Sequence, residues 1–118
     1  ARVEVTGTRE PLSPAIEVSL FRVAQESLTN VAKHAEASRV GVTLSYTGTE
    51  VLLDVRDDGR GFADGVGTGF GLTSMRQRIR GVGGQVVVQS TPGEGTSVSA
   101  RVPAIALGGA SERGWTDR

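Results

Sequence analysis

The feature that most constrains the fold of this chain is the regular alternation of apolar with other residues in four short runs. Residues 40–46 and 51–55 alternate with a period of two on either side of the turn Thr47-Gly48-Thr49. Because successive side chains of a strand point to opposite faces, these runs predict an antiparallel hairpin with one apolar face. A second hairpin is predicted from residues 86–88 and 98–102, which flank a turn at 91–95 and precede Pro103. The apolar positions of the two hairpins are Val40, Val42, Leu44, Tyr46, Val51, Leu53, Val55, Val86, Val88, Val98, Ala100 and Val102.

A long amphipathic helix is predicted over residues 14–35. Ser13 offers a capping hydroxyl, and Pro14 suits the first helical position. At about 100° per residue, one arc of this helix is apolar, and a line of polar residues lies well away from it. We therefore expect the apolar arc to face the core. The arc consists of Ile16, Leu20, Val23, Ala24, Leu28, Val31 and Ala35, and the polar line of Arg22, Glu26, Asn30 and Lys33.

The remaining elements complete an α/β fold with a mixed sheet. Apolar residues with helical spacing predict a second helix that begins near Leu72 and ends at Gly83-Gly84. Residues 2–6 alternate, which predicts one further short strand. From residue 104 to residue 118 the chain is rich in Gly, Ala, Ser and charged residues, so we expect a flexible C-terminal tail. Residues 1–103 are expected to form one domain, with its core in residues 14–103.

The composition narrows the classes of function. A chain of 118 residues is long enough for one domain with a single sizeable core. Its 13 basic and 13 acidic residues give no net charge, so we expect no nucleic acid as partner. The absence of cysteine excludes disulfides and thiolate metal sites and fits a reducing cytoplasm. No apolar run approaches the ~20 residues that span a bilayer. Because the sequence begins at Ala1 and not at Met, we expect it to be a piece of a longer protein.

Asp57 is the first candidate for ligand binding. It continues the inward-facing series of the strand at 51–55, so its carboxylate should point inside and that of Asp58 outward. A buried carboxylate needs hydrogen-bond donors, and the exocyclic amine of adenine is such a donor. Gly59 and Gly61 would let a flat base lie against bare backbone. The alternative is a strand end with Asp-Gly turn residues and no ligand.

A glycine-rich stretch at residues 65–71 is the second candidate. It precedes the second predicted helix, where free backbone amides and the positive end of the helix dipole favour a phosphate. It is not a Walker loop, because no Gly-Lys-Ser/Thr follows. A Rossmann turn is disfavoured, because no strand feeds directly into the glycines. The alternative is a flexible surface loop.

The polar line of the first predicted helix is the third candidate. Glu26, Asn30 and Lys33 lie at i, i+4 and i+7, on one helix face. Mg²⁺ held between ATP phosphates usually takes one or two protein oxygens, which Asn30 or Glu26 can supply, and Lys33 could then contact phosphate. The alternative is a solvated polar face. His34, the only histidine of the sequence, falls at the edge of the apolar arc, in a last helical turn that favours a cation.

In this order, the three elements resemble the sequence boxes of histidine kinases. Residues 25–35 resemble the N box, Asp57-x-Gly59-x-Gly61 the first glycine box, and Gly69-Phe70-Gly71-Leu72 the second. Gly95-Thr96-x-Val98 is similar to the closing threonine motif of the family. The N box and residues 71–78 are similar to those of kinases that pair with NarL-type response regulators. The resemblance covers residues 14–103.

This resemblance implies the Bergerat ATP-binding fold, a two-layer α/β sandwich with a mixed sheet of about five strands and helices on one face. By position, Asp57 would bind the adenine amine, Asn30 the Mg²⁺, and Lys33 a phosphate. Glu26 occupies the position of the general base in ATPases of this superfamily, which makes it a candidate catalytic residue and second metal ligand. The segment between Phe62 and Gly67 is a short lid for the family. The residues implied to bind ATP are Asn30, Lys33, Asp57, Gly59, Gly61, Gly69, Gly71, Leu72 and Thr96, the last near a water at the adenine site.

The resemblance also implies a function. We expect the ATP-binding catalytic domain of a two-component sensor histidine kinase, which presents the γ-phosphate of Mg·ATP to a histidine on a dimerisation domain outside these residues. The phosphate would pass to a response regulator, and the complete kinase would be a homodimer with this domain in the cytoplasm. We do not expect the lone domain to phosphorylate itself. Two alternatives share the fold: an anti-sigma-factor-type serine kinase, and a nucleotide-binding module without turnover.

Overall fold

Both predicted hairpins and the predicted N-terminal strand join in one mixed sheet. The computed structural model describes residues 2–8, 11–61 and 72–104. The strands are β1 (Arg2–Thr6), β2 (Val40–Tyr46), β3 (Glu50–Asp57), β4 (Gln85–Thr91) and β5 (Gly95–Pro103). Their order in the sheet is β1-β2-β3-β5-β4, with β1 parallel to β2 and the other neighbouring pairs antiparallel. The prediction of a mixed sheet of about five strands is therefore confirmed.

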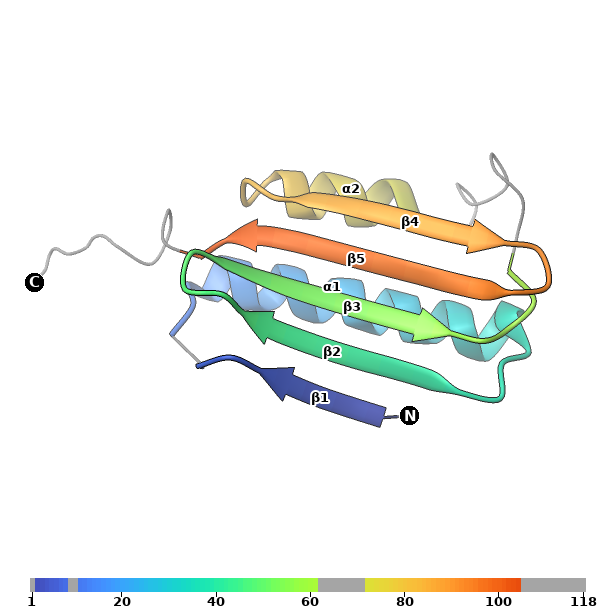
Figure 1. Cartoon of the computed structure of the whole chain (residues 1–118). Coiled ribbons are helices and arrows are strands. Elements are labelled where there is room, and N and C mark those ends of the chain that lie inside the picture. Colours follow the sequence, from blue (N-terminus) through green and yellow to red (C-terminus); the bar gives the residue numbers. More distant parts are fainter. Residues whose placement is uncertain (1, 9–10, 62–71, 105–118) are drawn as a thin grey trace, which may run out of the picture.

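Two helices lie together on one face of this sheet (Figure 1). They are α1 (Pro14–Asn30) and α2 (Leu72–Arg80), and α1 continues directly into the π-helix η1 (Val31–Ala35). The Ser13 hydroxyl accepts a hydrogen bond from the backbone N–H of Ile16 over 3.3 Å, which confirms the predicted cap. In the described ranges, neither helix is long and apolar enough to cross a membrane. The result is the predicted α/β sandwich.

The core forms between the helices and the inner face of the sheet. Cross-strand partners lie in rows, since residues in register point to the same face. One row contains Val42, Val55, Val98 and Val88, and the next contains Leu44, Leu53, Ala100 and Val86. The buried apolar side chains are Ile16, Leu20, Val23, Val51, Leu53, Val55, Leu72, Met75, Ile79, Val98, Ala100 and Val102.

Two serines of α1 are buried that the apolar arc did not include. Ser19 is 6% exposed and Ser27 is 3% exposed. The Ser27 hydroxyl donates to the Met75 sulfur of α2 over 3.7 Å, so a small polar side chain fits where the two helices contact each other. The buried face of α1 is therefore turned slightly toward α2 relative to the apolar arc. Ala24, Leu28 and Val31, which belong to that arc, are only half-buried.

The end of the first helix also departs from the prediction. A regular α-helix was expected up to Ala35, but Val31–Ala35 is a π-helix. A π turn closes its hydrogen bonds over i→i+5, so it holds more residues per turn than an α turn. Glu36 follows with φ of 51°, and this left-handed residue ends the helix. The side chain of Lys33 therefore leaves the helix in another direction than α-helical spacing from Asn30 predicts.

Candidate functional site

A polar row ends the inner face of the sheet. Beyond the buried pair Val55 and Val98, the next pair on the same face is Asp57 on β3 and Thr96 on β5. Ser90 on β4 pairs with Thr96, and the two hydroxyl oxygens are 2.8 Å apart. Asp57 thus points to the side of the sheet that the helices cover, as its parity predicted, and its side chain is half-buried.

The turn after β3 folds back onto Asp57. The backbone N–H of Gly59 donates to Asp57 Oδ1 over 2.8 Å, and Gly59 is buried. This single bond leaves acceptor capacity on the carboxylate, which has two oxygens and about four lone-pair sites. Asp57 is therefore oriented by its own turn and can still accept a hydrogen bond from a ligand amine.

Two glycines bring the turn at residues 91–95 against the end of β3. Gly61 has φ of +63°, and a Cβ atom there would lie 2.2 Å from the Thr91 carbonyl oxygen. Gly95 has φ of +99°, and a Cβ atom there would lie 2.0 Å from the Asp57 carbonyl oxygen. No real Cβ atom tolerates such distances to backbone. The first glycine box and the β4–β5 turn can make this contact only with glycine at both positions.

The end of α1 lies at the same end of the sheet as the end of β3 and the beginning of α2 (Figure 1). Glu26 and Asn30 fall in the regular part of α1, four residues apart, and both are half-buried. Lys33 falls in η1 and is exposed. The described residues contain no group of three or more His, Cys, Asp or Glu side chains that could hold a metal ion.

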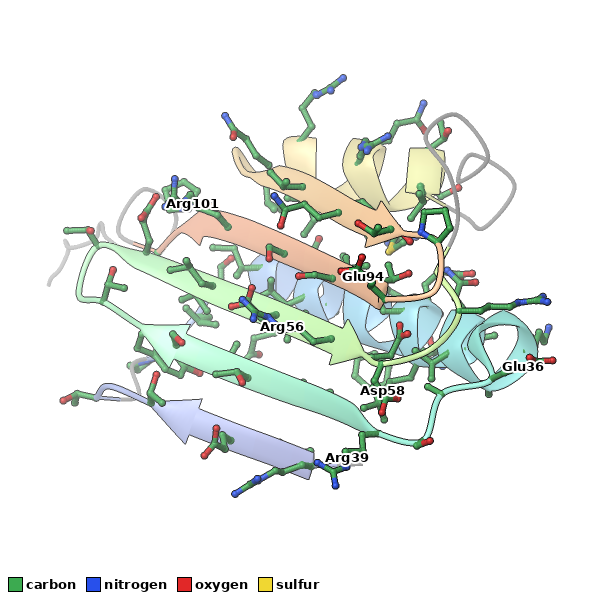
Figure 2. All side chains as sticks on the ribbon, turned by 45° about the vertical axis from the view of Figure 1, so that its right-hand side comes forward. Glu36, Arg39, Arg56, Asp58, Glu94 and Arg101 are labelled. Atoms are coloured by element: carbon green, nitrogen blue, oxygen red, sulfur yellow. The ribbon has the colours of Figure 1, made fainter. Side chains whose placement is uncertain are left out.

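Asp58 points away from this inner face, as its parity predicted. Its Oδ1 atom accepts hydrogen bonds from the backbone N–H groups of Ser38 and Arg39, each over 2.8 Å. The hydrogen bond from Arg39, more than any other contact, holds the pKa of the exposed Asp58 carboxyl below its ordinary value. Figure 2 shows Asp58 at the end of β3, close to the loop that carries Arg39.

Part of the predicted site lies outside the described residues. This holds for Gly69 and Gly71 of the second glycine box and for the lid between Phe62 and Gly67. Leu72 is described: it begins α2, and its side chain is buried in the core with 5% exposure. What Leu72 can offer to a ligand is therefore its backbone at the helix N-terminus.

Sequence reasoning missed Ser90, and it gave no role to the contact of Gly95 with β3 or to the hydrogen bonds of Asp58. Ser90 and Gly95 reach the site only because β5 pairs with β3 and β4. The alternation of each strand fixes which face a residue occupies, but it does not fix which strands are neighbours. For Asp58 the parity of the strand indicated the outward direction, but no pattern in the sequence indicates that the N–H groups of Ser38 and Arg39 lie within reach of its carboxylate.

Comparisons with known proteins agree with this geometry. The family described as "Histidine kinase-, DNA gyrase B-, and HSP90-like ATPase" matches residues 15–106. The sensor histidine kinase LiaS of Bacillus subtilis is 40% identical over 94 residues, which cover 78% of this chain and 26% of that protein. The signal transduction histidine-protein kinase/phosphatase UhpB of Salmonella typhimurium is 43% identical over 89 residues, which cover 75% of this chain and 18% of that protein. The chain thus spans about a quarter or less of the length of these relatives.

Solved structures show the same fold. The blue-light activated histidine kinase of Erythrobacter litoralis superimposes with a TM-score of 0.68 at 26% identity, over 87% of this chain and 35% of that one. The catalytic domain of the histidine kinase ThkA superimposes with a TM-score of 0.66 at 14% identity, over 86% of this chain and 76% of that one. At 14% identity, the match to ThkA supports the fold and nothing further.

Proposed function

Because this chain belongs to the family of histidine kinase-, DNA gyrase B- and HSP90-like ATPases, we propose that it is the ATP-binding catalytic domain of a sensor histidine kinase. The observation that carries the proposal is the position of Asp57. Its carboxylate ends the apolar inner face of the sheet, lies opposite Thr96, and is held by the backbone N–H of the buried Gly59. An inward carboxylate with free acceptor capacity fits the exocyclic amine of adenine.

The donor set on α1 fits a metal that arrives with the nucleotide. Asn30 and Glu26 can present one amide oxygen and one carboxylate from adjacent turns of one helix, which is the number of protein ligands that Mg²⁺ usually takes beside phosphates. Bound Mg²⁺ would neutralise phosphate charge. Lys33 would add a cation toward the phosphates from η1, and Gly69 and Gly71 would line them with backbone amides.

The chemistry of such a site is mainly positioning. Phosphoryl transfer needs little covalent assistance from the protein, since alignment and electrostatic stabilisation do most of the work. Asp57 and Thr96 would hold the base, Asn30 would hold the metal, and Glu26 would polarise the attacking histidine. That histidine would belong to a dimerisation domain of the same kinase, and a response regulator would receive the phosphate. The complete kinase would be a homodimer, with this domain in the cytoplasm.

The test is transfer of label between two proteins. The isolated 118-residue chain, incubated with radiolabelled Mg·ATP, should bind it but acquire no acid-labile phosphohistidine. His34, its single histidine, belongs to η1, the segment proposed to supply Lys33 to the phosphates, so we expect no in-line transfer to it. Adding the phospho-accepting helical segment of the parent kinase should produce acid-labile label on that segment. The Asn30→Ala domain should fail to produce it.

Two results would contradict the proposal. Acid-labile label on His34 of the lone chain would make this a different kind of kinase. A chain that binds no adenine nucleotide in calorimetry would not be a catalytic domain at all.

A further inference from the structure

The two halves of the proposed nucleotide site lie on separate elements joined by a short loop. Asp57 ends β3, whereas Asn30 ends α1 and Lys33 lies in η1. The loop at residues 36–39 leaves η1 and enters β2. Because this loop follows the helix directly, its position determines where the helix end lies relative to Asp57. Contacts that fix the loop therefore also fix the distance from Asp57, which would bind the base, to Asn30 and Lys33, which would face the phosphates.

Asp58 fastens this loop to the end of β3 at three points. Its Oδ1 atom accepts from the backbone N–H groups of Ser38 and Arg39, each over 2.8 Å. Its own backbone N–H donates to the Arg39 carbonyl oxygen over 3.2 Å. Hydrogen bonds from backbone N–H groups to a carboxylate are about twice as strong as those between neutral groups. The loop is thus attached at the residue next to Asp57.

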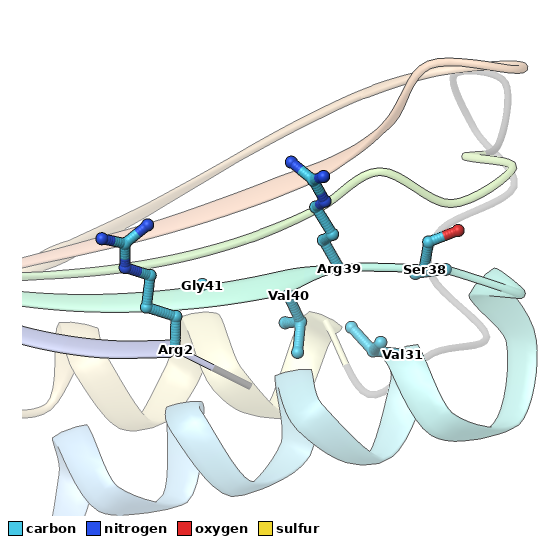
Figure 3. Close-up of a pocket in the computed structure, with 7 residues that line it drawn as sticks. Arg2, Val31, Ser38, Arg39, Val40 and Gly41 are labelled. Atoms are coloured by element: carbon cyan, nitrogen blue, oxygen red, sulfur yellow. The ribbon is translucent and has the colours of Figure 1, made fainter.

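Side-chain packing does little to hold the same loop. A pocket of about 390 Å³ opens beside it. Figure 3 shows the Val40 side chain pointing toward the helices, near Val31, while the Arg39 side chain points away from the helices. Since the space next to the loop is hollow, few apolar contacts would oppose a shift of the loop. Beyond the β2–β3 pairing, which reaches Val40 and Asp57, the three hydrogen bonds to Asp58 hold the loop. The pocket is lined by Arg2, Val31, Ala37, Ser38, Arg39, Val40 and Gly41.

Asp58 does not itself face the nucleotide. It is exposed and points to the outer face of the sheet, whereas Asp57 points to the inner face. Any effect of Asp58 on nucleotide binding must therefore pass through the backbone of the loop and of β3.

We propose that Asp58 is a positioning residue for nucleotide binding, which holds the end of the α1–η1 helix against Asp57 through the loop at residues 36–39. The proposal rests on the proposed function, and it assigns to the second residue of the first glycine box a role that contact with ATP does not explain. The position of the acceptor oxygen contributes more to this role than the negative charge does.

Three variants of Asp58 separate geometry from charge. Asp58→Ala removes the acceptor, Asp58→Asn keeps an oxygen at the same place without the charge, and Asp58→Glu keeps the charge but moves it by one methylene. Asp54→Ala is the matched control, because Asp54 is also an outward carboxylate of β3, and it accepts from Ser99 Oγ over 2.5 Å on the other neighbouring strand. The readouts are calorimetric affinity for Mg·ATP, at a temperature where each variant is fully folded, and exchange of the Ser38 and Arg39 amides by NMR.

We expect Asp58→Ala to weaken Mg·ATP binding by at least about fivefold and to speed exchange of both amides. Asp58→Asn should stay within about threefold of the parent chain and bind more tightly than Asp58→Glu. Asp54→Ala should leave both readouts unchanged. If Asp58→Ala fails to fold, the comparison of Asn with Glu still decides between geometry and charge.

The opposite outcomes overturn the inference. Faster amide exchange in Asp58→Ala with unchanged affinity would show that the loop does not position the site, while the proposed function would stand. Equal weakening by Asp54→Ala would show a general effect on β3. Tighter binding by Asp58→Glu than by Asp58→Asn would assign the effect to charge. A parent chain that binds no nucleotide would overturn both proposals, and this result is distinguishable from the others.

Discussion

Asp57 and Thr96 occupy directly opposed positions on β3 and β5, one row beyond the buried pair Val55 and Val98. The inner face of the sheet therefore changes from apolar to polar between one inward-facing residue and the next on both strands. A flat ligand bound there would have apolar side chains under its ring and a carboxylate at its edge. Adenine has this combination of an apolar face and an amine donor, which leads to the first prediction.

Replacement of Asp57 should change which base the domain prefers. The carboxylate accepts from the adenine amine, but it meets the carbonyl of guanine with a second acceptor, so the parent chain should bind ATP more tightly than GTP. A charged hydrogen bond is worth roughly 1.5–3 kcal/mol, so Asp57→Ala should weaken ATP binding by about tenfold or more. GTP binding should change little, which makes it an internal control. Equal affinities of the parent chain for ATP and GTP in calorimetry would rule out this role of Asp57.

Replacement of Asn30 should act through the metal. If its amide oxygen holds Mg²⁺, Asn30→Ala should abolish the gain in ATP affinity that Mg²⁺ provides and leave binding without Mg²⁺ nearly unchanged. The matched control is Gln25→Ala, which removes an exposed amide from the same helix. Titrations with ATP in Mg²⁺ and in chelator measure the difference. Should Asn30→Ala and Gln25→Ala respond alike to Mg²⁺, Asn30 belongs to an ordinary solvated face.

The strands and the direction of Asp57 could be predicted from the sequence because both depend on local alternation. Residues 51–57 contain a period of two, and that period alone places Asp57 on the side of Val55. The helix cap at Ser13 is local in the same way. Sequence patterns of this kind report on backbone geometry within a few residues, and there the prediction holds.

Contacts between strands that are distant in sequence could not be predicted in the same way. Gly95 lies against the Asp57 carbonyl because β5 is inserted between β3 and β4, and no local pattern encodes this order. The π turn of η1 could not be predicted for another reason. Its apolar and polar residues satisfy helical spacing nearly as well in α as in π geometry, so periodicity does not distinguish the two over five residues.

Gly95 offers a test of the close contact with Asp57. Gly95 and Gly93 both have a positive φ, of +99° and +83°, but a Cβ atom at Gly93 would meet nothing within 4 Å. Gly93→Ala should therefore cost only the backbone strain, about 1–2 kcal/mol of the free energy of unfolding. Gly95→Ala adds a clash with backbone and should cost about 3 kcal/mol or more. Urea denaturation of the two variants measures both values. Equal losses would mean that the turn at residues 91–95 yields easily and that the contact is not tight.

The hydrogen bonds of Asp58 predict a pH dependence of stability. The pKa of its carboxyl lies below the ordinary value of 3.8, chiefly because the backbone N–H of Arg39 donates to the charged form. A carboxyl whose pKa is lowered on folding contributes stability above its unfolded pKa and loses that contribution as the pH falls through the folded pKa. The parent chain should therefore be more stable than Asp58→Asn above about pH 4, where the carboxylate is charged in both states.

This difference should shrink as the pH falls below 3.8 and vanish once Asp58 is protonated in the folded protein. Urea denaturation of both chains at several pH values between about 2.5 and 6 measures it, with Asp54→Asn as a control for the removal of an outward carboxylate from β3. Because Asp58 is exposed, salt should reduce the charge effect but leave the two hydrogen bonds to Ser38 and Arg39 in place. A difference between parent and Asp58→Asn that is constant from pH 6 to pH 2.5 would show that the folded protein does not favour the charged carboxylate, contrary to the hydrogen-bond geometry.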